Sequence, residues 1–296
     1  MLLGRLRNAF TPIAVALALA LLVMPACARA AGTPGVAAKC PNRGPARPAL
    51  CASAYYILDE SDFTVLAARN ARVAAPIASI TKLMTSLVVL EAGLPMQEKI
   101  FIEREDVEGT AGTASRLAPG SRLSRADLLH LALMSSENRA AHALCRTFPG
   151  GLKECVRAMN HKAVVLGMTT AHFTDPTGLS TGNVSSAEDL AKLVRAAARS
   201  PTIREYSTDR FYTVRVNNKA LEYRSTNPLV NDLDWNVTVQ KTGYVSDAGP
   251  CLVMQAVIDG RDVVIVLLHS SGPLNRVGDA TAVRHWMQSM TRAATR

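Results

Sequence analysis

The sequence predicts an α+β fold in which strands from both ends of the chain form one antiparallel sheet and helices fill the middle. Apolar runs typical of strands lie at 52–58, 63–68, 211–216, 237–241, 252–258 and 263–269. Between the two groups, apolar residues recur at helical spacing from residue 80 to about 198. A sheet built from the two chain ends, with a helical insertion, is the simplest arrangement that pairs these strands.

The first 49 residues predict an export segment and a linker. Arg5 and Arg7 precede an apolar run at 13–24, and small residues follow it. This pattern is typical of a cleavable signal peptide over 1–30, because the apolar run is short for a transmembrane anchor. Residues 31–49 are rich in Ala, Gly and Pro and predict a flexible lead-in. We therefore expect an exported protein with no stable membrane span after cleavage.

The folded region is predicted to begin with a hairpin that turns at 59–62. Pro76 marks the start of a helix with one apolar stripe, formed by Ile80, Leu83, Met84, Leu87 and Val88. Ser124 is the expected N-cap of the next helix. Further helices are predicted at 124–134, 138–146, 152–165, 186–198 and 279–292. Asp259-Gly260 predicts a tight hairpin between the last two strands.

The charge and histidine content narrow the possible partners. The formal net charge is +9, and loss of the three arginines in residues 1–30 leaves about +6. A basic excess of this size suits an anionic surface such as the cell wall. Export and the lack of a nucleic-acid-binding motif argue against nucleic acid. The six histidines show no metal-ligand spacing, so we expect no metal site.

Five cysteines remain after the predicted cleavage. Cys40 and Cys51 flank a Pro/Gly loop, and Cys145 and Cys155 flank a break between two helices. Both pairs are candidates for local disulfides in an oxidising compartment. Cys251 opens an apolar strand and is predicted to be a buried free thiol. The sequence alone leaves this connectivity open.

Three short sequence words carry the chemistry. They are Ser79-Ile80-Thr81-Lys82, Ser136-Glu137-Asn138 and Lys241-Thr242-Gly243. Each word alone has a structural interpretation, such as a serine helix cap or an exposed helix lysine. The ordered set, spread over most of the chain, indicates a serine acyl-transfer site with a lysine base.

The first word supplies a nucleophile and a base. Ser79 lies at a helix start, where its own backbone N–H is available as an oxyanion donor. Lys82 lies three residues later on the same helix edge and can take the serine proton only when it is neutral. Its ordinary pKa of about 10.4 must therefore fall by about 3.4 units. Burial and a nearby cation both act in that direction, and Lys241 is the candidate cation.

The second and third words are predicted to serve the leaving group and the substrate. Ser136, in a turn between two helices, is the candidate proton relay to the leaving amine. Asn138 is expected to hold Lys82 or the substrate amide by hydrogen bonds. Lys241 and Thr242 end a strand and can bind a carboxylate. Gly243 lets a substrate backbone come close.

Longer segments around these words carry a family resemblance. They are 79–85, 136–141, 241–244 and the Asp-Pro-Thr-Gly-Leu-Ser segment at 175–180. They are similar to the low-molecular-mass D-alanyl-D-alanine carboxypeptidase/endopeptidase family of penicillin-binding proteins, and most of all to its endopeptidase branch. The resemblance runs from about Ala52 to the C-terminus. It implies a β-lactamase/transpeptidase-like α/β/α sandwich over 50–296, with an all-helical subdomain at about 105–200.

The resemblance also assigns roles to individual residues. Ser79 matches the acylated nucleophile and Lys82 its base, while Ser136 and Asn138 match the second motif. Lys241, Thr242 and Gly243 match the substrate-binding motif, and Tyr244 follows where the family places the second oxyanion N–H. The implied function is periplasmic cleavage of D-Ala–diamino acid cross-links. The implied partners are peptidoglycan stem peptides, with β-lactam antibiotics as covalent inhibitors, and no metal or organic cofactor is implied.

Three other functions use the same words. A class A β-lactamase needs a deacylating glutamate, and its Glu-x-x-Leu-Asn word is absent between Asn138 and Lys241. A D-alanyl-D-alanine carboxypeptidase shares the site chemistry. Its larger members add a β-rich domain and a C-terminal amphipathic anchor, which we do not find here. A non-catalytic wall-binding protein is disfavoured by the complete nucleophile and base.

Overall fold

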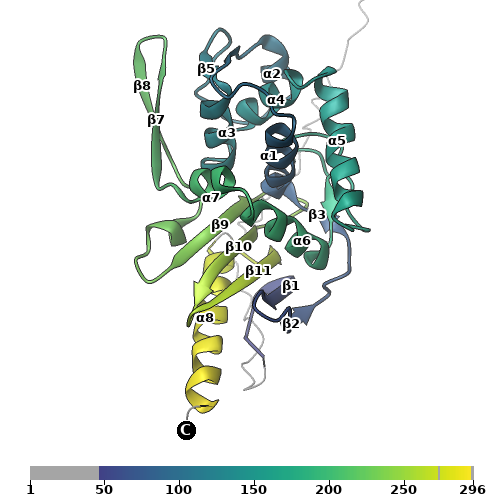
Figure 1. Ribbon diagram of the computed structural model, residues 1–296, viewed down its shortest axis with the longest axis vertical. Coiled ribbons are helices and arrows are strands. Elements are labelled where there is room, and N and C mark those ends of the chain that lie inside the picture. The colour runs from purple at the N-terminus through teal and green to yellow at the C-terminus, as the bar shows by residue number, and fades with distance from the viewer. Residues whose placement is uncertain (1–46, 273, 295–296) are drawn as a thin grey trace, which may run out of the picture. The chain divides into compact units, whose positions relative to one another are not determined.

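A five-stranded antiparallel sheet forms the centre of the computed structural model, which describes residues 47–272 and 274–294 (Figure 1). Its strand order is β2-β1-β11-β10-β9. The strands are β1 (Ala52–Asp59), β2 (Val65–Arg69), β9 (Asn236–Gly243), β10 (Cys251–Ile258) and β11 (Arg261–Ser270). Ala52 lies opposite Ser270, so the two ends of the chain meet inside the sheet. This confirms the predicted assembly.

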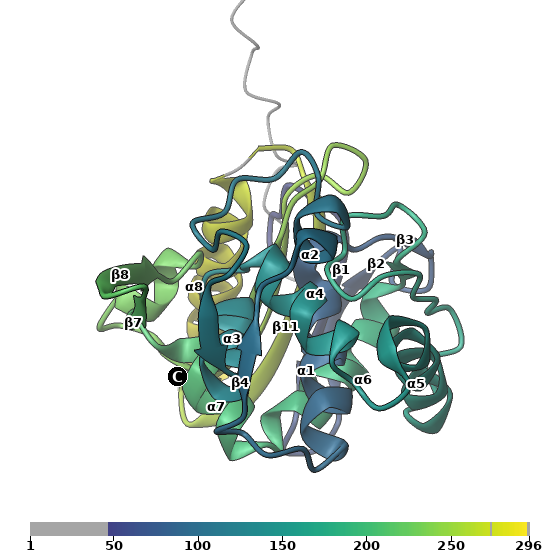
Figure 2. The same ribbon diagram turned by 90° about the horizontal axis from the view of Figure 1, so that it is seen from above.

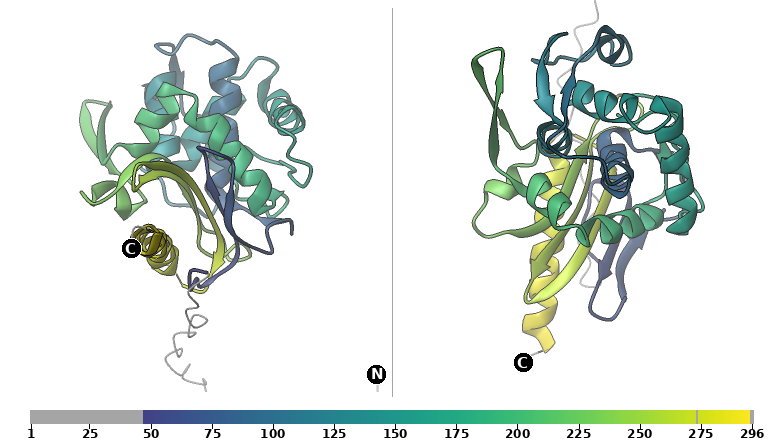
Figure 3. Two further views of the ribbon diagram at one scale, coloured as in Figure 1. Left: turned by 60° about the horizontal axis from the view of Figure 1, so that its bottom comes forward. Right: turned by 45° about the horizontal axis from the view of Figure 1, so that its top comes forward.

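Helices cover both faces of the sheet. The long helix α8 (Asn275–Ala294) lies against one face, and α1 (Thr81–Glu91) and α6 (Ala187–Ala198) lie on the other (Figures 2 and 3). The remaining helices are α2 (Arg104–Glu108), α3 (Arg125–Met134), α4 (Asn138–Arg146), α5 (Gly151–Val165) and α7 (Pro201–Thr208). The predicted α/β/α sandwich is therefore confirmed.

Period-two alternation along the central strands explains the two cores. In β10, Val253 packs into the core shared with α1 and α6, whereas Leu252 and Met254 pack into the core shared with α8. Because both faces of the sheet are covered, β10 is apolar at all positions but Gln255, and β11 is continuously apolar from Val263 to Leu268. The continuous apolar runs in the sequence thus reflect burial on both sides.

Two local predictions are wrong. Pro76 does not start a helix: it lies in the short strand β3 (Ala75–Pro76), which pairs with β6 (Val184–Ser185). Strand β7 (Phe211–Val216) does not join the central sheet, but pairs with β8 (Lys219–Arg224) in a separate hairpin that projects from the sheet (Figures 1 and 2). Alternate residues of β7 are exposed to solvent. Such alternation predicts a strand with one buried face, but it does not predict which sheet the strand joins.

The cysteine predictions have three outcomes. Cys145 and Cys155 form a disulfide that joins α4 to α5, with a Cα–Cα distance of 5.3 Å. Cys251 is a buried free thiol, and burial raises its pKa to about 11. Cys40 lies outside the described residues, as do the predicted signal peptide and most of the lead-in. Among residues 47–272 and 274–294, no helix has the length and apolarity needed to span a membrane.

Asp279 fastens the start of β1 to α8. Its buried carboxylate accepts hydrogen bonds from the backbone N–H groups of Cys51 at 2.7 Å and Ala52 at 2.8 Å, and from the Ser270 hydroxyl at 3.0 Å. Asp279→Ala leaves these donors buried without an acceptor, so we expect a loss of about 3 kcal/mol in unfolding free energy. Urea denaturation measures it, with exposed Asp247→Ala as the control. Equal stability of the two variants would contradict this assignment.

Candidate active site

Ser79 and Lys82 lie at the junction between a 3-10 turn and α1. The turn spans Ala78–Ile80, and α1 begins at Thr81. The Lys82 ammonium donates hydrogen bonds to Ser79 Oγ at 2.8 Å, to Asn138 Oδ1 at 2.7 Å and to the Thr177 carbonyl at 2.7 Å. These three acceptors match the three N–H groups of a protonated lysine. The first two words of the sequence therefore meet at one amine.

Burial controls the protonation of this amine. Lys82 is 0 % exposed, and burial lowers its pKa to about 7, against the opposing charges of Asp175 and Glu137. The pKa fall required of a lysine base is thus present. The expected contribution of Lys241 to this fall is not seen. Instead, burial and the charges of Lys82 and Arg276 lower the pKa of Lys241 well below its ordinary value.

Acylation should therefore depend on pH through Lys82. The neutral amine is the active form, so the acylation rate constant should rise about tenfold per pH unit below pH 7 and level off above it. The second-order rate constant for penicillin acylation, measured from pH 5 to 9, gives this profile. A flat profile below pH 7, in protein that remains folded, would contradict the role of Lys82.

The second word occupies a strained turn between α3 and α4. Ser136 has a positive φ of 61°, a conformation that costs a non-glycine residue roughly 1 kcal/mol or more. The N-cap of α4 is Glu137 rather than Ser135 or Ser136. Glu137 Oε2 accepts the Ala140 N–H at 2.7 Å, and Asn138 then begins α4. The turn directs Asn138 to Lys82, while Ser136 lines a neighbouring pocket of about 370 Å³.

The third word forms the end of β9, which runs past the backbone of Ser79. A Cβ placed on Gly243 would lie 2.9 Å from the Ile77 carbonyl oxygen and 3.3 Å from Ser79 N. Only glycine therefore permits this approach. Lys241 is buried and its Nζ donates to the Thr242 carbonyl at 2.8 Å. All three words therefore converge on the Ser79–Lys82 pair.

Two further contacts complete this edge of the site. The Thr242 hydroxyl shares a hydrogen bond of 2.6 Å with the Thr226 hydroxyl. Arg276, from α8, donates to the Gly243 carbonyl at 3.0 Å. Tyr244, which follows β9, is 64 % exposed. The end of β9 is thus held by Thr226, which follows the β7–β8 hairpin, and by Arg276 of α8.

The Asp-Pro-Thr-Gly segment has a structural role that the sequence did not reveal. Asp175 accepts the backbone N–H groups of Thr177 at 2.6 Å and Gly178 at 2.8 Å. This turn holds the Thr177 carbonyl against Lys82. Gly178 has a φ of +82°, and a Cβ there would lie 1.9 Å from the Ala78 carbonyl oxygen. The Asp-x-Thr-Gly turn signal was available, but its contact with Ala78 is tertiary.

Gly178→Ala should damage both stability and acylation. We expect a loss of about 2–4 kcal/mol, because the methyl group adds overpacking against Ala78 to the strain of a positive φ. Gly112→Ala is the matched control, since Gly112 also has a φ of +82° and its Cβ would meet nothing within 4 Å. Urea denaturation and penicillin acylation measure both variants. Equal effects would refute the importance of the Ala78 contact.

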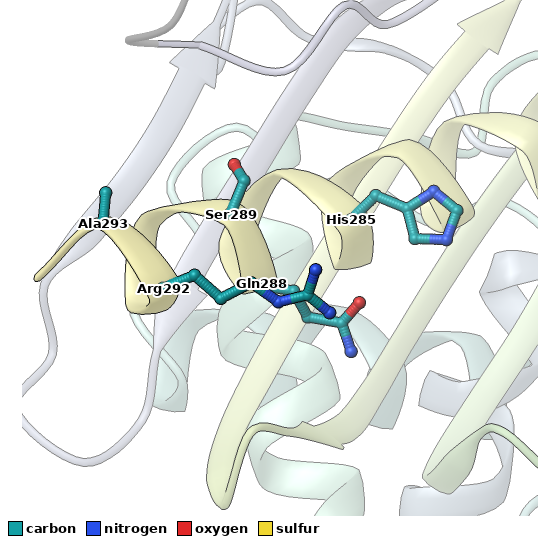
Figure 4. Close-up of a pocket in the computed structure, with 5 residues that line it drawn as sticks. All are labelled: His285, Gln288, Ser289, Arg292 and Ala293. Carbon is teal, nitrogen blue, oxygen red and sulfur yellow. The ribbon is translucent and has the colours of Figure 1, made fainter. Parts of the chain in front are cut away.

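A larger pocket lies elsewhere, on the C-terminal half of α8 (Figure 4). Its volume is about 660 Å³, and its lining residues are His285, Gln288, Ser289, Arg292 and Ala293. None of the three sequence words contributes to it. The convergence of the three words at Ser79 and Lys82, rather than pocket size, identifies the candidate active site.

Comparisons with known proteins agree with this geometry. Residues 42–272 match the family model described as D-alanyl-D-alanine carboxypeptidase. The chain is 42 % identical to a D-alanyl-D-alanine endopeptidase of Pseudomonas aeruginosa, over 83 % of this chain and 80 % of that protein. It is 41 % identical to a D-alanyl-D-alanine endopeptidase of Escherichia coli, over 82 % of this chain and 79 % of that protein.

Solved structures show the same fold. A Streptomyces DD-transpeptidase aligns with a TM-score of 0.75 and 26 % identity, over 81 % of this chain and 98 % of that one. A D-alanyl-D-alanine carboxypeptidase from Mycobacterium tuberculosis aligns with a TM-score of 0.73 and 27 % identity, over 80 % of this chain and 91 % of that one.

Proposed function

This chain belongs to the D-alanyl-D-alanine carboxypeptidase family of serine peptidases, and on that premise we propose that it hydrolyses D-Ala–diamino acid cross-links of peptidoglycan through an acyl-enzyme on Ser79. The observation that carries this proposal is the hydrogen bond of 2.8 Å between Lys82 Nζ and Ser79 Oγ, in a buried site where the pKa of Lys82 is about 7. The endopeptidase activity follows the names of relatives that are 41–42 % identical.

The reaction proceeds in two halves. Neutral Lys82 takes the Ser79 hydroxyl proton as Oγ attacks the D-Ala carbonyl carbon, and the backbone N–H groups of Ser79 and Tyr244 receive the oxyanion. The proton then passes through Ser136 to the leaving amine, the C–N bond breaks, and an ester to Ser79 remains. Water hydrolyses this ester, with Lys82 accepting a proton from the water and returning it to Oγ.

The remaining site residues bind the substrate. Lys241 and Thr242, at the end of β9, are the proposed partners of the substrate carboxylate. Gly243 lets the substrate backbone pair with β9, because the strand is at the edge of the sheet. Asn138 holds Lys82 in place. No residue in this scheme requires a metal or an organic cofactor.

Carboxypeptidase activity is the second candidate, since other relatives carry that name and the chemistry is the same. Only the leaving group differs: a single D-Ala instead of a second stem peptide. For either activity we propose a periplasmic location after signal-peptide cleavage. The Cys145–Cys155 disulfide supports an oxidising compartment.

Purified cross-linked muropeptide dimers and monomeric pentapeptides distinguish the two activities. We expect dimers to be converted to monomers, as measured by mass spectrometry, with slower release of free D-Ala from pentapeptides. Release of D-Ala with dimers left intact would replace the endopeptidase proposal by the carboxypeptidase. Failure to act on either substrate, in protein that fluorescent penicillin labels, would contradict both.

A further inference from the structure

The pocket of about 370 Å³ beside Ser136 has no assigned role. Three segments far apart in the sequence line it: 114–116, 135–137 and residues 223–224 of the projecting hairpin. Figure 1 shows this hairpin, β7–β8, standing beside α3 rather than against the sheet. The hairpin therefore supplies one wall of a pocket that opens next to the proposed proton relay.

Two guanidinium groups give this pocket its chemistry. Arg116 donates to the Glu222 carbonyl at 2.6 Å, and its guanidinium lies 4.0 Å from the centroid of the Tyr223 ring. Arg224 also lines the pocket, and its side chain is 80 % exposed. The hairpin backbone and the Tyr223 ring thus hold Arg116, whose side chain remains exposed at the pocket.

The acidic groups nearby are already engaged. Glu137 lines the pocket, but its carboxylate accepts the Ala140 N–H at the start of α4. The Glu222 carboxylate pairs with Arg224 at 2.8 Å. Within residues 47–272 and 274–294, no carboxylate forms an ion pair with Arg116. Among the described residues, Arg116 is therefore the arginine of this pocket that has no ion-pair partner.

The position of Ser136 decides which part of a substrate reaches this pocket. Under the proposed function, Ser136 passes the proton to the leaving amine, so the pocket lies on the leaving-group side of Ser79. A single D-Ala ends at its carboxylate, which Lys241 and Thr242 bind. The leaving group of a cross-link is a longer peptide that carries further carboxylates.

We infer that the pocket formed by Arg116, Tyr223 and Arg224 binds a carboxylate of the departing stem peptide, and so selects cross-links over single D-Ala leaving groups. This inference rests on the proposed function. Bidentate guanidinium–carboxylate pairing gives the specificity, with Arg116 as the principal partner and Arg224 at the exposed rim. The β7–β8 hairpin is then a substrate-binding element.

Arg116→Gln and Arg224→Gln test this assignment. The measured quantity is the ratio of kcat/KM for dimer cleavage to the rate constant for penicillin acylation, because penicillin carries no departing peptide. We expect this ratio to fall about tenfold in Arg116→Gln, mainly through KM, and less in Arg224→Gln. Arg215→Gln, an exposed arginine on β7 outside the pocket, is the matched control and should leave the ratio unchanged.

The outcomes are separable from those of the proposed function. An unchanged ratio in Arg116→Gln, or the same fall in Arg215→Gln, would overturn the inference while wild-type dimer cleavage still supports the endopeptidase. Equal losses of dimer cleavage and penicillin acylation would also overturn it, because they would indicate a general effect on the site. Absence of dimer cleavage by the wild-type protein would overturn both.

Discussion

Ser79→Ala will lose covalent labelling by fluorescent penicillin and at least about 10³-fold of peptidase activity. The Ser79 hydroxyl is the proposed site of acylation, and among the described acceptors of Lys82 Nζ it is the one hydroxyl. Removing one oxygen from a half-buried side chain should leave the fold intact. Gel fluorescence after incubation with the probe, and dimer cleavage followed by mass spectrometry, measure the two losses.

Ser289→Ala is the control for this experiment, because Ser289 is exposed on α8 and lies outside the site. It should label like the wild-type protein. Labelling of Ser79→Ala at the wild-type rate would show that another residue is acylated. The assignment of Ser79 as the nucleophile, on which the proposed function depends, would then be wrong.

Lys82→Met is expected to produce the second large effect. Methionine has a similar length but no amine, so Ser79 loses its base and acylation should fall by about 10²–10⁴-fold. The substitution has two opposing effects on stability. Asn138 Oδ1 and the Thr177 carbonyl lose their shared hydrogen-bond donor, but the cost of burying a charged amine is also removed. The time course of penicillin acylation measures the rate, and circular dichroism with urea denaturation checks the fold.

A pH profile makes this second test specific. Residual acylation by Lys82→Met should no longer rise through pH 7, because the group that titrates there is gone. A folded Lys82→Met variant that keeps the wild-type profile would assign the titration to another group. Lys82→Arg adds a further check, since a guanidinium keeps the charge but does not deprotonate in this range.

Contacts in the site between residues close in sequence could be predicted, whereas contacts that depend on tertiary packing could not. Ser79 and Lys82 are three residues apart on one helical turn, so their meeting was predictable from spacing alone. Asn138 was predictable as a partner of Lys82 only because the ordered words were interpreted as one set. The Thr177 carbonyl was not predictable, because any residue can supply a backbone acceptor and its side chain gives no signal.

The fold shows the same division. The central strands were predicted because burial on both faces leaves continuous apolar runs, as in β10 and β11. Strand β8 and helix α7 were missed: β8 is mostly exposed and α7 buries few residues. Arg276 was also not singled out, because its contact with Gly243 depends on how α8 packs across the sheet.

The pairing of β1 with β11 has a consequence for how the protein is made. β1 takes a place inside the sheet, between β2 and β11, and Ala52 pairs with Ser270. A nascent chain therefore cannot complete its sheet until nearly all of it has been synthesised, and such long-range pairing slows folding. Under the proposed export, this delay favours completion of the sheet after translocation rather than before it.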